Sequence, residues 1–564
     1  MAGGPASPAG PGAPSGDFCV IIPAVKKEGS IPDQLVKKLA GVTLIQRALN
    51  KALRLTAPQH ILVVTDSQEI SLIAQRNGVP FVRDADLRLN HGWILKDIGP
   101  HIQETARRYP YTVIYRPTAP LIYDQDIRRG LELLVRRGGD ILVTLRPEHR
   151  HFWRLEGEAP LLWQQGLERE HLHAECKAFM ILGRQALTGG PQGKKVVPFI
   201  LGDQAVEIAS HQDWWVCERL LRRKRVLFVT QGNASLGLGH VYRCLLLAHE
   251  ISEHQVLFLC TSQSEIAYSR IASFDYQTFM QEGGLAAQVL SLNPDLVIND
   301  ILDTSAEYVE ALRQAGIKVV NFEDNGPGAL AADLVFNALY EDGPSLSPHL
   351  RAGHQYFCLR DEFEGAQRRP PAPEVREVLI TFGGTDPNDF TRQTLETLLP
   401  LAQASGIRLN IVTGPGYQHK AALLARLNEL GEAAIGFSDG TRVISSMMER
   451  ADLAISSAGR TVLELVHMQK PCIIMSHHAR EHSHSFARPK NGVVYLGVMA
   501  PFKAVKLRRV FTAMLGQGLR QKFYERMTRF DFSENKERVL SEIWSLLEPR
   551  RPWPAAPARK ALET

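Results

Sequence analysis

Residues 225–249 place an ionisable side chain directly behind a glycine turn. The segment reads RVLFVT, then QGNASLGLGH, then the helical pattern VYRCLLLAH. A strand, a glycine turn and a helix in this order present free backbone N–H groups to an anion, and Gly237 and Gly239 allow the backbone to approach a ligand closely. His240 stands at the start of the helix, where an imidazole can act as a general base on water. A histidine that only caps or packs the helix is the alternative interpretation.

Three later segments repeat this arrangement. VLITFGGTDPND contains Gly383 and Gly384, VTGPGYQHK contains Gly414, and ADLAISSAGRTVLEL places small residues before a helix. In that last turn the candidate ligand-binding residues are Ser457, Gly459 and Thr461. Their small size allows a diphosphate to approach, and Glu464, one turn further on, offers two carboxylate oxygens to a vicinal diol such as a ribose. For Glu464 alone, a solvated position on the helix surface is the alternative.

Two carboxylates at strand ends and one arginine are candidates for assisting His240. Asp300 ends the run LVIND, and Asp324 follows the run KVVNF. Either carboxylate could orient the imidazole or bind sugar hydroxyls, and loop capping is an equally good interpretation of both. Arg243, together with the amides of the glycine turn, is a candidate for supporting a departing anionic group.

Parallel sheets are needed to position these residues, and the sequence alternates between buried strands and helices accordingly. Strand-like runs such as FCVIIPA, HILVVTD, QVLFLC, DLVIND and PCIIMS are separated by segments with helical spacing, which is typical of parallel sheets covered by helices. The pattern restarts near Arg222 and again after the linker RRPPAPEVRE. We therefore expect a disordered tail, three α/β units and a second tail, at 1–16, 17–222, 223–370, 371–545 and 546–564.

The composition limits the classes of function. The chain has 564 residues, 44% hydrophobic and 22% charged, and its formal net charge of +5 suits anionic small substrates but does not indicate nucleic acid. Seven cysteines without a CxxC pair argue against a disulfide framework or a zinc site and favour a reducing cytoplasm. No apolar run approaches the roughly 20 residues that a membrane helix needs, and the first residues lack the pattern of a signal peptide. We expect a cytoplasmic protein.

The second half of the chain resembles a known family over about residues 224–500. GLGHVYR, LVIND, FED, ADLVFNALY, FGGTDPND, TGPGYQHK and ADLAISSAGRTVLE occur in the order seen in the UDP-sugar hydrolase of the pseudaminic-acid pathway and its spore-coat polysaccharide relatives. The resemblance implies a two-lobed GT-B fold that holds a UDP-sugar in its cleft and transfers the sugar to water without a cofactor. His240 matches the catalytic histidine of that family, and Glu464 matches its ribose-binding glutamate.

The sequence departs from this family after PCIIMS, where relatives commonly continue with Asn-Gln. Here HHAREHSHSFA follows, and Arg480, Glu481, His482 and His484 form a polar group where the sugar or uracil is expected. We expect Arg480, Glu481 and His484 to face the ligand, because the segment follows a strand beside the nucleotide loop. An ordinary surface loop is the alternative. The departure leaves the sugar open, and it also allows epimerisation coupled to hydrolysis.

The first half resembles the sugar-acid cytidylyltransferases over about residues 18–221. The segments FCVIIPAVKKEGSIPDQLVKKL, VVTDSQEISLIAQRNGVPFVRDADL, YRPTAPLIYDQDIRRGLELL and VEIASHQDWWVCE follow that family's order. The resemblance implies a Rossmann-like nucleotidyltransferase that moves CMP from CTP to a nine-carbon sugar acid with Mg²⁺. The candidate CTP-binding residues are Lys26, Lys27, Asp66 and Arg116.

Two departures affect the chemistry of this half. The family usually has an arginine directly after the first strand, where this chain has Val25, and lysine lacks the fork geometry of arginine. The family's acidic-X-Asp pair is here Glu207-Ile208-Ala209, so that Glu207 is the candidate metal ligand and Asp213 lies four residues further on. A degenerate domain that binds a nucleotide or supports assembly is therefore as good an interpretation as a catalytic one.

Three hypotheses remain for the whole α/β chain. The first is a bifunctional enzyme of nonulosonic-acid biosynthesis that joins UDP-sugar hydrolysis to CMP transfer. The second is a UDP-sugar-dependent glycosyltransferase, and the third is a protein whose N-terminal domain is a non-catalytic scaffold. The expected partners are a UDP-sugar and, for the N-terminal domain, CTP, a nonulosonic acid and Mg²⁺. A homodimer through the N-terminal domain is left open.

Overall fold

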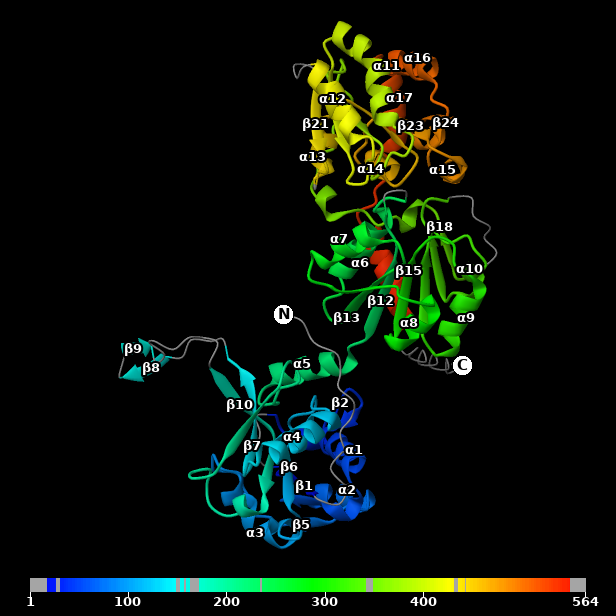
Figure 1. The fold of residues 1–564 in the computed structure, drawn as a ribbon. Helices are drawn as coiled ribbons and strands as arrows, with labels where there is room; N and C mark the ends of the chain where they lie inside the picture. The colour runs from blue at the N-terminus through cyan, green and yellow to red at the C-terminus, as the bar shows by residue number, and fades with distance from the viewer. Residues whose placement is uncertain are drawn as a thin grey trace, which may run out of the picture. The chain divides into compact units, whose positions relative to one another are not determined.

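The computed structural model describes residues 18–26, 31–148, 172–233, 236–340, 348–430, 435–441 and 443–547, and the backbone of 153–156 and 159–162. The chain folds into two compact units, 1–223 and 224–564 (Figure 1). The tail expected at 1–16, and all but the first two residues of the one expected at 546–564, lie outside the described residues.

The first unit is built on a seven-stranded sheet with the strand order β11-β7-β10-β6-β1-β4-β5. These strands are β1 (Phe18–Ala24), β4 (Ile61–Thr65), β5 (Phe81–Arg83), β6 (Tyr111–Tyr115), β7 (Ile141–Pro147), β10 (His173–Gly183) and β11 (Val196–Ile200). Its helices are α1 (Leu44–Leu55), α2 (Gln68–Arg76), α3 (Leu95–Ala106), α4 (Asp124–Arg137) and α5 (His211–Arg222).

One strand of this sheet differs from the parallel arrangement that the sequence predicts. β10 runs antiparallel to both of its neighbours, β6 and β7, whereas the other strand pairs are parallel. The chain passes from β7 to β10 through the hairpin of β8 (Trp153–Glu156) and β9 (Ala159–Leu162). The described residues of this connection include no crossover helix, and a strand that returns in this way runs in the opposite direction, so the sheet is mixed.

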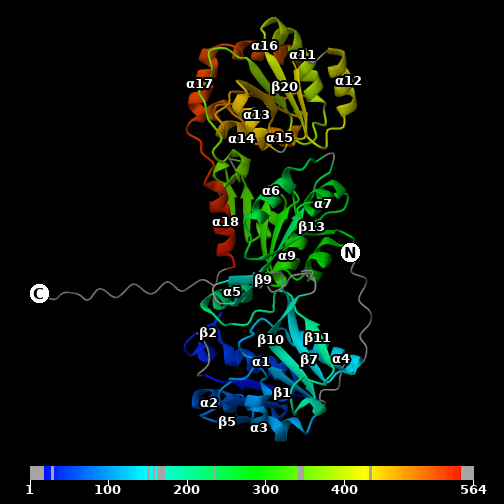
Figure 2. The same cartoon turned by 90° about the vertical axis from the view of Figure 1, so that its left-hand side faces the viewer.

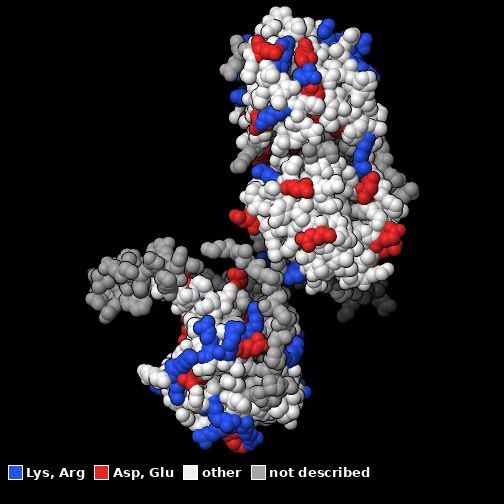
Figure 3. Space-filling view, viewed as in Figure 1, with Lys and Arg blue, Asp and Glu red and all other residues white. Residues whose placement is uncertain are grey.

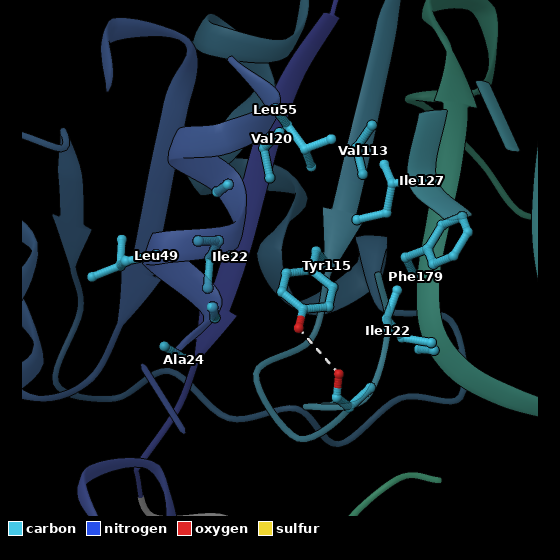
Figure 4. Packing of buried hydrophobic residues seen from close by; sticks show 14 of the residues in the cluster. Val20, Ile22, Ala24, Leu49, Leu55, Val113, Tyr115, Ile122, Ile127 and Phe179 are labelled. Carbon is cyan, nitrogen blue, oxygen red and sulfur yellow. Dashed lines mark hydrogen bonds between the residues drawn. The ribbon is translucent and has the colours of Figure 1, made fainter. Parts of the chain in front are cut away.

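The buried strand β1 forms the centre of the first unit's core. All seven of its residues are buried, because helices cover a central parallel strand on both faces. On one face Val20 and Ile22 belong to the same cluster as Leu49 of α1 (Figure 4). Tyr115 of β6 lies in this cluster too, and its hydroxyl donates a hydrogen bond to the carbonyl oxygen of Ala119 at 3.0 Å.

The second unit contains two lobes, and the first is a seven-stranded parallel sheet with the order β14-β13-β12-β15-β16-β17-β18. The strands are β12 (Arg225–Thr230), β13 (Gln255–Cys260), β14 (Gln277–Met280), β15 (Leu296–Asp300), β16 (Lys318–Phe322), β17 (Leu334–Asn337) and β18 (Leu350–Ala352). The helices are α6 (Gly239–His249), α7 (Glu265–Ala272), α8 (Leu285–Ser291), α9 (Ala306–Gln314) and α10 (Gly328–Ala331).

The second lobe is a six-stranded parallel sheet with the order β21-β20-β19-β22-β23-β24. The strands are β19 (Glu377–Thr381), β20 (Arg408–Thr413), β21 (Ile435–Asp439), β22 (Leu453–Ser457), β23 (Cys472–Ser476) and β24 (Val494–Val498). The helices are α11 (Phe390–Ala404), α12 (Lys420–Leu430), α13 (Ile444–Arg450), α14 (Thr461–His467), α15 (Ala479–Ser483), α16 (Ala504–Met514), α17 (Gln517–Met527) and α18 (Asn535–Ser545).

The strand order gives each lobe a topological switch point. In the first lobe it lies between β12 and β15, and in the second between β19 and β22. In open α/β sheets, ligands bind outside the carboxyl ends of the strands at such a point. The residues that end or directly follow these four strands are therefore the ones that the fold places for binding.

Each lobe packs against a segment that the sequence places with the other lobe. Val539 and Ile543 of α18 pack in the same cluster as Val226 of β12, and Figure 2 shows α18 beside the first lobe's sheet. Conversely, Phe363, which precedes β19, packs in a core cluster of the second lobe. The structure thus differs from a simple division after residue 370, because apolar spacing marks a helix as amphipathic without saying which lobe it covers.

The α/β class expected from the sequence, with two Rossmann-ordered lobes in the second unit, is confirmed by these sheets. Among the helices of the described residues, none is both long and apolar enough to cross a bilayer. On the face shown in Figure 3, basic side chains gather more densely on the first unit than on the second. Residues 1–223 contain 29 Lys and Arg against 23 Asp and Glu, whereas residues 224–564 contain 36 against 37.

Candidate functional site

His240 and Asp300 meet at the switch point of the first lobe. His240 is the second residue of α6, which follows β12, and Asp300 is the last residue of the neighbouring strand β15. His240 Nδ1 lies 2.6 Å from Asp300 Oδ1. Because an ionised carboxylate only accepts hydrogen bonds, Nδ1 carries the proton and Nε2 is left as an acceptor. The His240 side chain is 15% exposed, so this nitrogen belongs to a ring that solvent reaches.

Arg243 holds Asp300 from the other side. Its Nε and Nη2 donate to the two oxygens of Asp300 at 2.7 and 2.6 Å, and its Nη1 donates to Glu323 Oε1 at 3.0 Å. Burial alone would raise the pKa of Asp300, but Arg243 and His240 lower it to about 2. Burial likewise opposes the charge on Arg243, yet Asp300 and Glu323 raise its pKa above the ordinary value. Arg243, Asp300 and Glu323 are buried, so His240 is the exposed end of this network.

Asp324 has contacts of a different kind. Its carboxylate accepts hydrogen bonds from Thr304 N–H at 3.1 Å and Thr304 hydroxyl at 2.6 Å, from the Asn321 amide at 2.6 Å and from Gly326 N–H at 2.8 Å. These are the contacts of a loop cap, and none of them orients His240. Glu323 contacts Arg243 but was not predicted from the sequence. The one feature that could have indicated it is its position directly after a buried strand.

The glycine turns of the two lobes pack directly against each other. A Cβ on Gly384 would lie 3.4 Å from Leu238 N of the first lobe, and within the second lobe a Cβ on Gly414 would overlap the Cα of Gly384. Gly237 and Gly383 have φ angles of 79° and 76°, in the left-handed region that glycine adopts without strain. Packing therefore requires glycine at 414 and backbone conformation favours it at 237 and 383, while the contact of these turns with a ligand remains a prediction.

The loop after β22 faces the glycine turn of the first lobe. Ser457 ends β22, Gly459 follows in the turn, and Thr461 begins α14. A Cβ on Gly239 would lie 3.7 Å from Cδ of Arg460. The loop and the turn that carries His240 are thus neighbours, although they come from different lobes.

Glu464 is buried, unlike the solvated helix surface that was the alternative for it. Its Oε1 accepts a hydrogen bond from Nε of Arg360 at 2.9 Å. Arg360 also lies 2.6 Å from Glu362. The sequence analysis missed Arg360 because it stands in an irregular segment 104 residues before Glu464. Binding of a ribose by Glu464 remains a prediction.

The side chains after β23 have separate partners and do not form one group. Arg480 donates its two Nη groups to the carboxylate of Asp303 in the first lobe, each at 3.0 Å. His484 Nδ1 lies 2.7 Å from the carbonyl oxygen of Ala458, so Nδ1 carries the proton and burial lowers the pKa of this imidazole. Arg480 therefore contacts the first lobe, and His484 contacts the loop after β22.

Glu481 and His482 lie differently. Glu481 accepts a hydrogen bond from the backbone N–H of His477 at 2.7 Å, and burial raises its pKa to about 7. His482 is exposed, and its Nδ1 lies 2.7 Å from the Tyr495 hydroxyl. Glu481 thus helps to begin α15, and His482 packs on β24.

A hollow of about 430 Å³ opens at the carboxyl end of β15. Its lining includes Ile301, Thr304 and Tyr308, and also Asp303, which holds Arg480. The hollow therefore adjoins the contact between the lobes, on the same sheet edge as His240 and Asp300.

The first unit brings its candidates to the carboxyl ends of parallel strands. Lys26 follows β1, and its backbone N–H donates to Oδ1 of Asp66, which follows β4, at 2.7 Å. Lys26 Nζ lies 2.7 Å from Glu69 Oε2 and 3.2 Å from Asp33 Oδ1. Its ammonium group is thus paired with carboxylates, and Lys27 lies outside the described residues.

Arg116 and Glu207 form a looser contact. Arg116 Nη1 lies 3.7 Å from Glu207 Oε1, and burial raises the pKa of Glu207. Asp213 accepts a hydrogen bond from Ser210 at the start of α5 instead of joining them. Across the described part of the chain, no three His, Cys, Asp or Glu side chains are grouped as a metal ion requires. Binding of Mg²⁺ by Glu207 remains a prediction.

Comparison with known proteins finds a family model that matches part of the second lobe. A family model for the glycosyltransferase family 28 C-terminal domain matches residues 378–528. The uncharacterized protein MJ1062 of Methanocaldococcus jannaschii is 26% identical over 270 residues, 44% of this chain and 55% of that protein. The chain thus spans about half the length of this relative. The spore coat polysaccharide biosynthesis protein SpsG of Bacillus subtilis is 23% identical over 256 residues, 43% of this chain and 75% of SpsG.

A further relative is a cytidylyltransferase. The CMP-N,N'-diacetyllegionaminic acid synthase of Legionella pneumophila is 26% identical over 136 residues, 22% of this chain and 59% of the synthase. Among solved structures, the match to MurG of Acinetobacter baumannii covers 57% of this chain and 99% of MurG, with 16% identity and a TM-score of 0.42. Residues 378–528 thus match the glycosyltransferase family 28 C-terminal domain, and another comparison finds similarity to a CMP-sugar-acid synthase.

Proposed function

We propose that the second unit hydrolyses a UDP-linked acetamido sugar, as a cytoplasmic step of nonulosonic-acid or surface-polysaccharide biosynthesis. The observation that carries this proposal is the His240–Asp300 pair at the switch point of the first lobe. Asp300 fixes the tautomer of His240, and Arg243 fixes Asp300. The names of SpsG and of the CMP-sugar-acid synthase support the pathway.

The pair supplies the base that hydrolysis needs. Nε2 of His240 takes a proton from water as the water oxygen bonds to the anomeric carbon. The bond between that carbon and the β-phosphate oxygen breaks, and its electron pair leaves with UDP. The ionised Asp300 stabilises the imidazolium that forms, as a carboxylate does in other histidine-assisted hydrolyses.

A glycosyltransferase is the second candidate for the same site. The match of residues 378–528 to a glycosyltransferase domain favours it. In this case the base would act on an acceptor hydroxyl instead of water, and the residues named above would keep their places.

The experiment that separates these functions follows release of free UDP from UDP-N-acetylhexosamine derivatives. Hydrolysis releases UDP without any acceptor, and His240→Ala should reduce the rate by about 10²–10⁴-fold. His249→Ala is the matched control, because His249 ends the same helix, is exposed and stacks on Tyr276. Release that needs an added acceptor supports the transferase, and equal loss in both variants contradicts a role for His240.

For the first unit we propose nucleotide binding, with CMP transfer from CTP to a sugar acid as the activity to test. The order of its motifs and the similarity to a CMP-sugar-acid synthase support the fold of such an enzyme, and Glu207 is the residue proposed to bind Mg²⁺. Pyrophosphate release from CTP with a nonulosonic acid tests transfer. Binding of CTP without turnover supports the scaffold, and light scattering of the full chain tests the homodimer.

A further inference from the structure

Four arginines lie where the two lobes of the second unit meet, and three of them are neutralised by carboxylates. The ion pairs, with their N···O distances, are Arg243 with Asp300 (2.6 Å) and Glu323 (3.0 Å), Arg360 with Glu464 (2.9 Å) and Glu362 (2.6 Å), and Arg480 with Asp303 (3.0 Å). The fourth is Arg460. In the part of the chain that the structure describes, no carboxylate lies within ion-pair distance of its guanidinium.

The contacts of Arg460 hold its side chain without neutralising it. Its Nη2 donates to the carbonyl oxygen of Cys358 at 3.1 Å, and its guanidinium lies 4.8 Å from the centre of the Phe357 ring. A guanidinium has five N–H donors, so most of them remain for another partner. Burial and the charge of Arg243 together lower the pKa of Arg460 to about 10. The carboxylates of Glu464 and Asp300 act on Arg460 only from a distance, so an anion in contact with its guanidinium would be stabilised there.

Arg460 also lies beside the residues proposed to react. It directly follows Gly459 in the loop after β22, and Gly239, the neighbour of His240, packs against its side chain. Its lobe is basic, since residues 371–534, which exclude α18, contain 20 Lys and Arg against 15 Asp and Glu, whereas residues 224–370 contain 10 against 18. An anionic group in the cleft is thus drawn toward the second lobe.

We propose that Arg460 binds the diphosphate of the nucleotide sugar and stabilises the charge that UDP gains as it leaves. This inference rests on the function proposed above. When the bond between the anomeric carbon and the β-phosphate oxygen breaks, the electron pair stays on that oxygen, and the guanidinium supplies N–H donors in a fork that fits phosphate. Arg243, to which the sequence assigned this role, is unavailable because its nitrogens are committed to Asp300 and Glu323.

The test is calorimetric titration of the full chain with uridine, UMP and UDP. We expect the native protein to bind UDP more tightly than uridine, because only UDP offers phosphate oxygens to Arg460. Arg460→Ala should weaken UDP binding roughly 10- to 100-fold and change uridine binding less than about twofold. Arg460→Lys should lose less, because it keeps the charge but not the fork. Arg426→Ala is the control, since Arg426 is paired with Glu429 on the exposed side of α12.

Three other outcomes would contradict the role of Arg460, and they differ in what they say of the proposed function. If the native protein binds UDP but Arg460→Ala keeps the full preference for UDP over uridine, the role of Arg460 is wrong and the proposed function stands. If the native protein binds neither UDP nor uridine, the proposed function falls and the inference falls with it. If the Ala and Lys variants both lose uridine as well, Arg460 is a structural residue and the inference is overturned.

Discussion

The two units place charged side chains at equivalent positions, the carboxyl ends of parallel strands, but they pair them differently. In the second unit Arg243 grips Asp300 through two nitrogens, with side chains only 3% and 0% exposed. In the first unit Arg116 and Glu207 are 22% and 30% exposed, and their closest N···O distance is 3.7 Å. A buried charge must keep its partner, whereas a half-exposed charge can exchange it for water.

This difference has a consequence for function. The buried pair in the second unit leaves His240 in one tautomer and one orientation, as a general base requires. The loose pair in the first unit has a long contact with one further group, the Thr118 hydroxyl, which donates to Glu207 at 3.5 Å. The second unit thus fixes the side chain that the proposed hydrolysis uses, whereas the first unit leaves the charged pair at its proposed nucleotide site loosely held.

The largest expected effect comes from breaking the buried pair. Arg243→Met should destabilise the first lobe of the second unit by about 3–5 kcal/mol, because it leaves Asp300 and Glu323 buried without their cation. Hydrogen exchange read by mass spectrometry on peptides from β15 measures the loss separately from the first unit. Arg313→Met, on an exposed and loosely paired arginine, is the control. A loss below about 1 kcal/mol would show that the network is not a buried unit.

A smaller effect is expected where two glycine turns of the second lobe meet. Gly414→Ala should cost about 1–3 kcal/mol, because the new methyl group would overlap the backbone of Gly383 and Gly384 and the turns would have to move apart. The same change should weaken UDP binding by displacing the loops of the cleft. Gly283→Ala has open space around it and should have little effect on either measurement. Equal stability of both variants would mean that the turns are not held together.

Glu481 should give the second unit a pH dependence near neutrality. Burial raises its pKa from 4.5 to about 7, so the unfolded chain loses this proton before the folded one and stability falls as the pH rises through that window. Glu481→Gln should remove this decline, so that its stability relative to the native protein is greater at pH 8 than at pH 4 by roughly 3 kcal/mol. Urea unfolding at the two pH values measures the difference. Glu429→Gln, at an exposed position, should change nothing, and a native-like slope in Glu481→Gln would assign the decline to other groups.

The sequence predicts much of the fold and less of the site. Runs such as LVIND and PCIIMS are strands because continuous apolar residues suit a parallel sheet buried on both faces, and the structure has them as β15 and β23. Predicting His240 beside Asp300 needs only the rule that carboxyl ends of neighbouring strands meet. β10 was not foreseen as antiparallel, because its direction depends on the hairpin that precedes it.

Pairings between distant residues are what local patterns do not contain. Arg360 pairs with Glu464 across 104 residues, and Arg480 pairs with Asp303 across 177. No local sequence pattern predicts either pair. For the same reason Arg243 was assigned to the departing group, although it is used to hold Asp300. Tertiary contacts decide which arginine is left without a carboxylate partner. Arg460 is identified because the other three arginines are paired.

The smallest expected effect lies in the first unit and completes the comparison. Glu207→Gln should change stability by less than about 0.5 kcal/mol at neutral pH, because its contact with Arg116 is long and both side chains reach solvent. Hydrogen exchange in peptides from β6 and β10 measures this change beside that of Arg243→Met in the second unit. A loss as large as the one expected for Arg243→Met would mean that the Arg116–Glu207 pair is a rigid element of a working site. The first unit would then be organised as the second is, and CMP transfer would become its better interpretation.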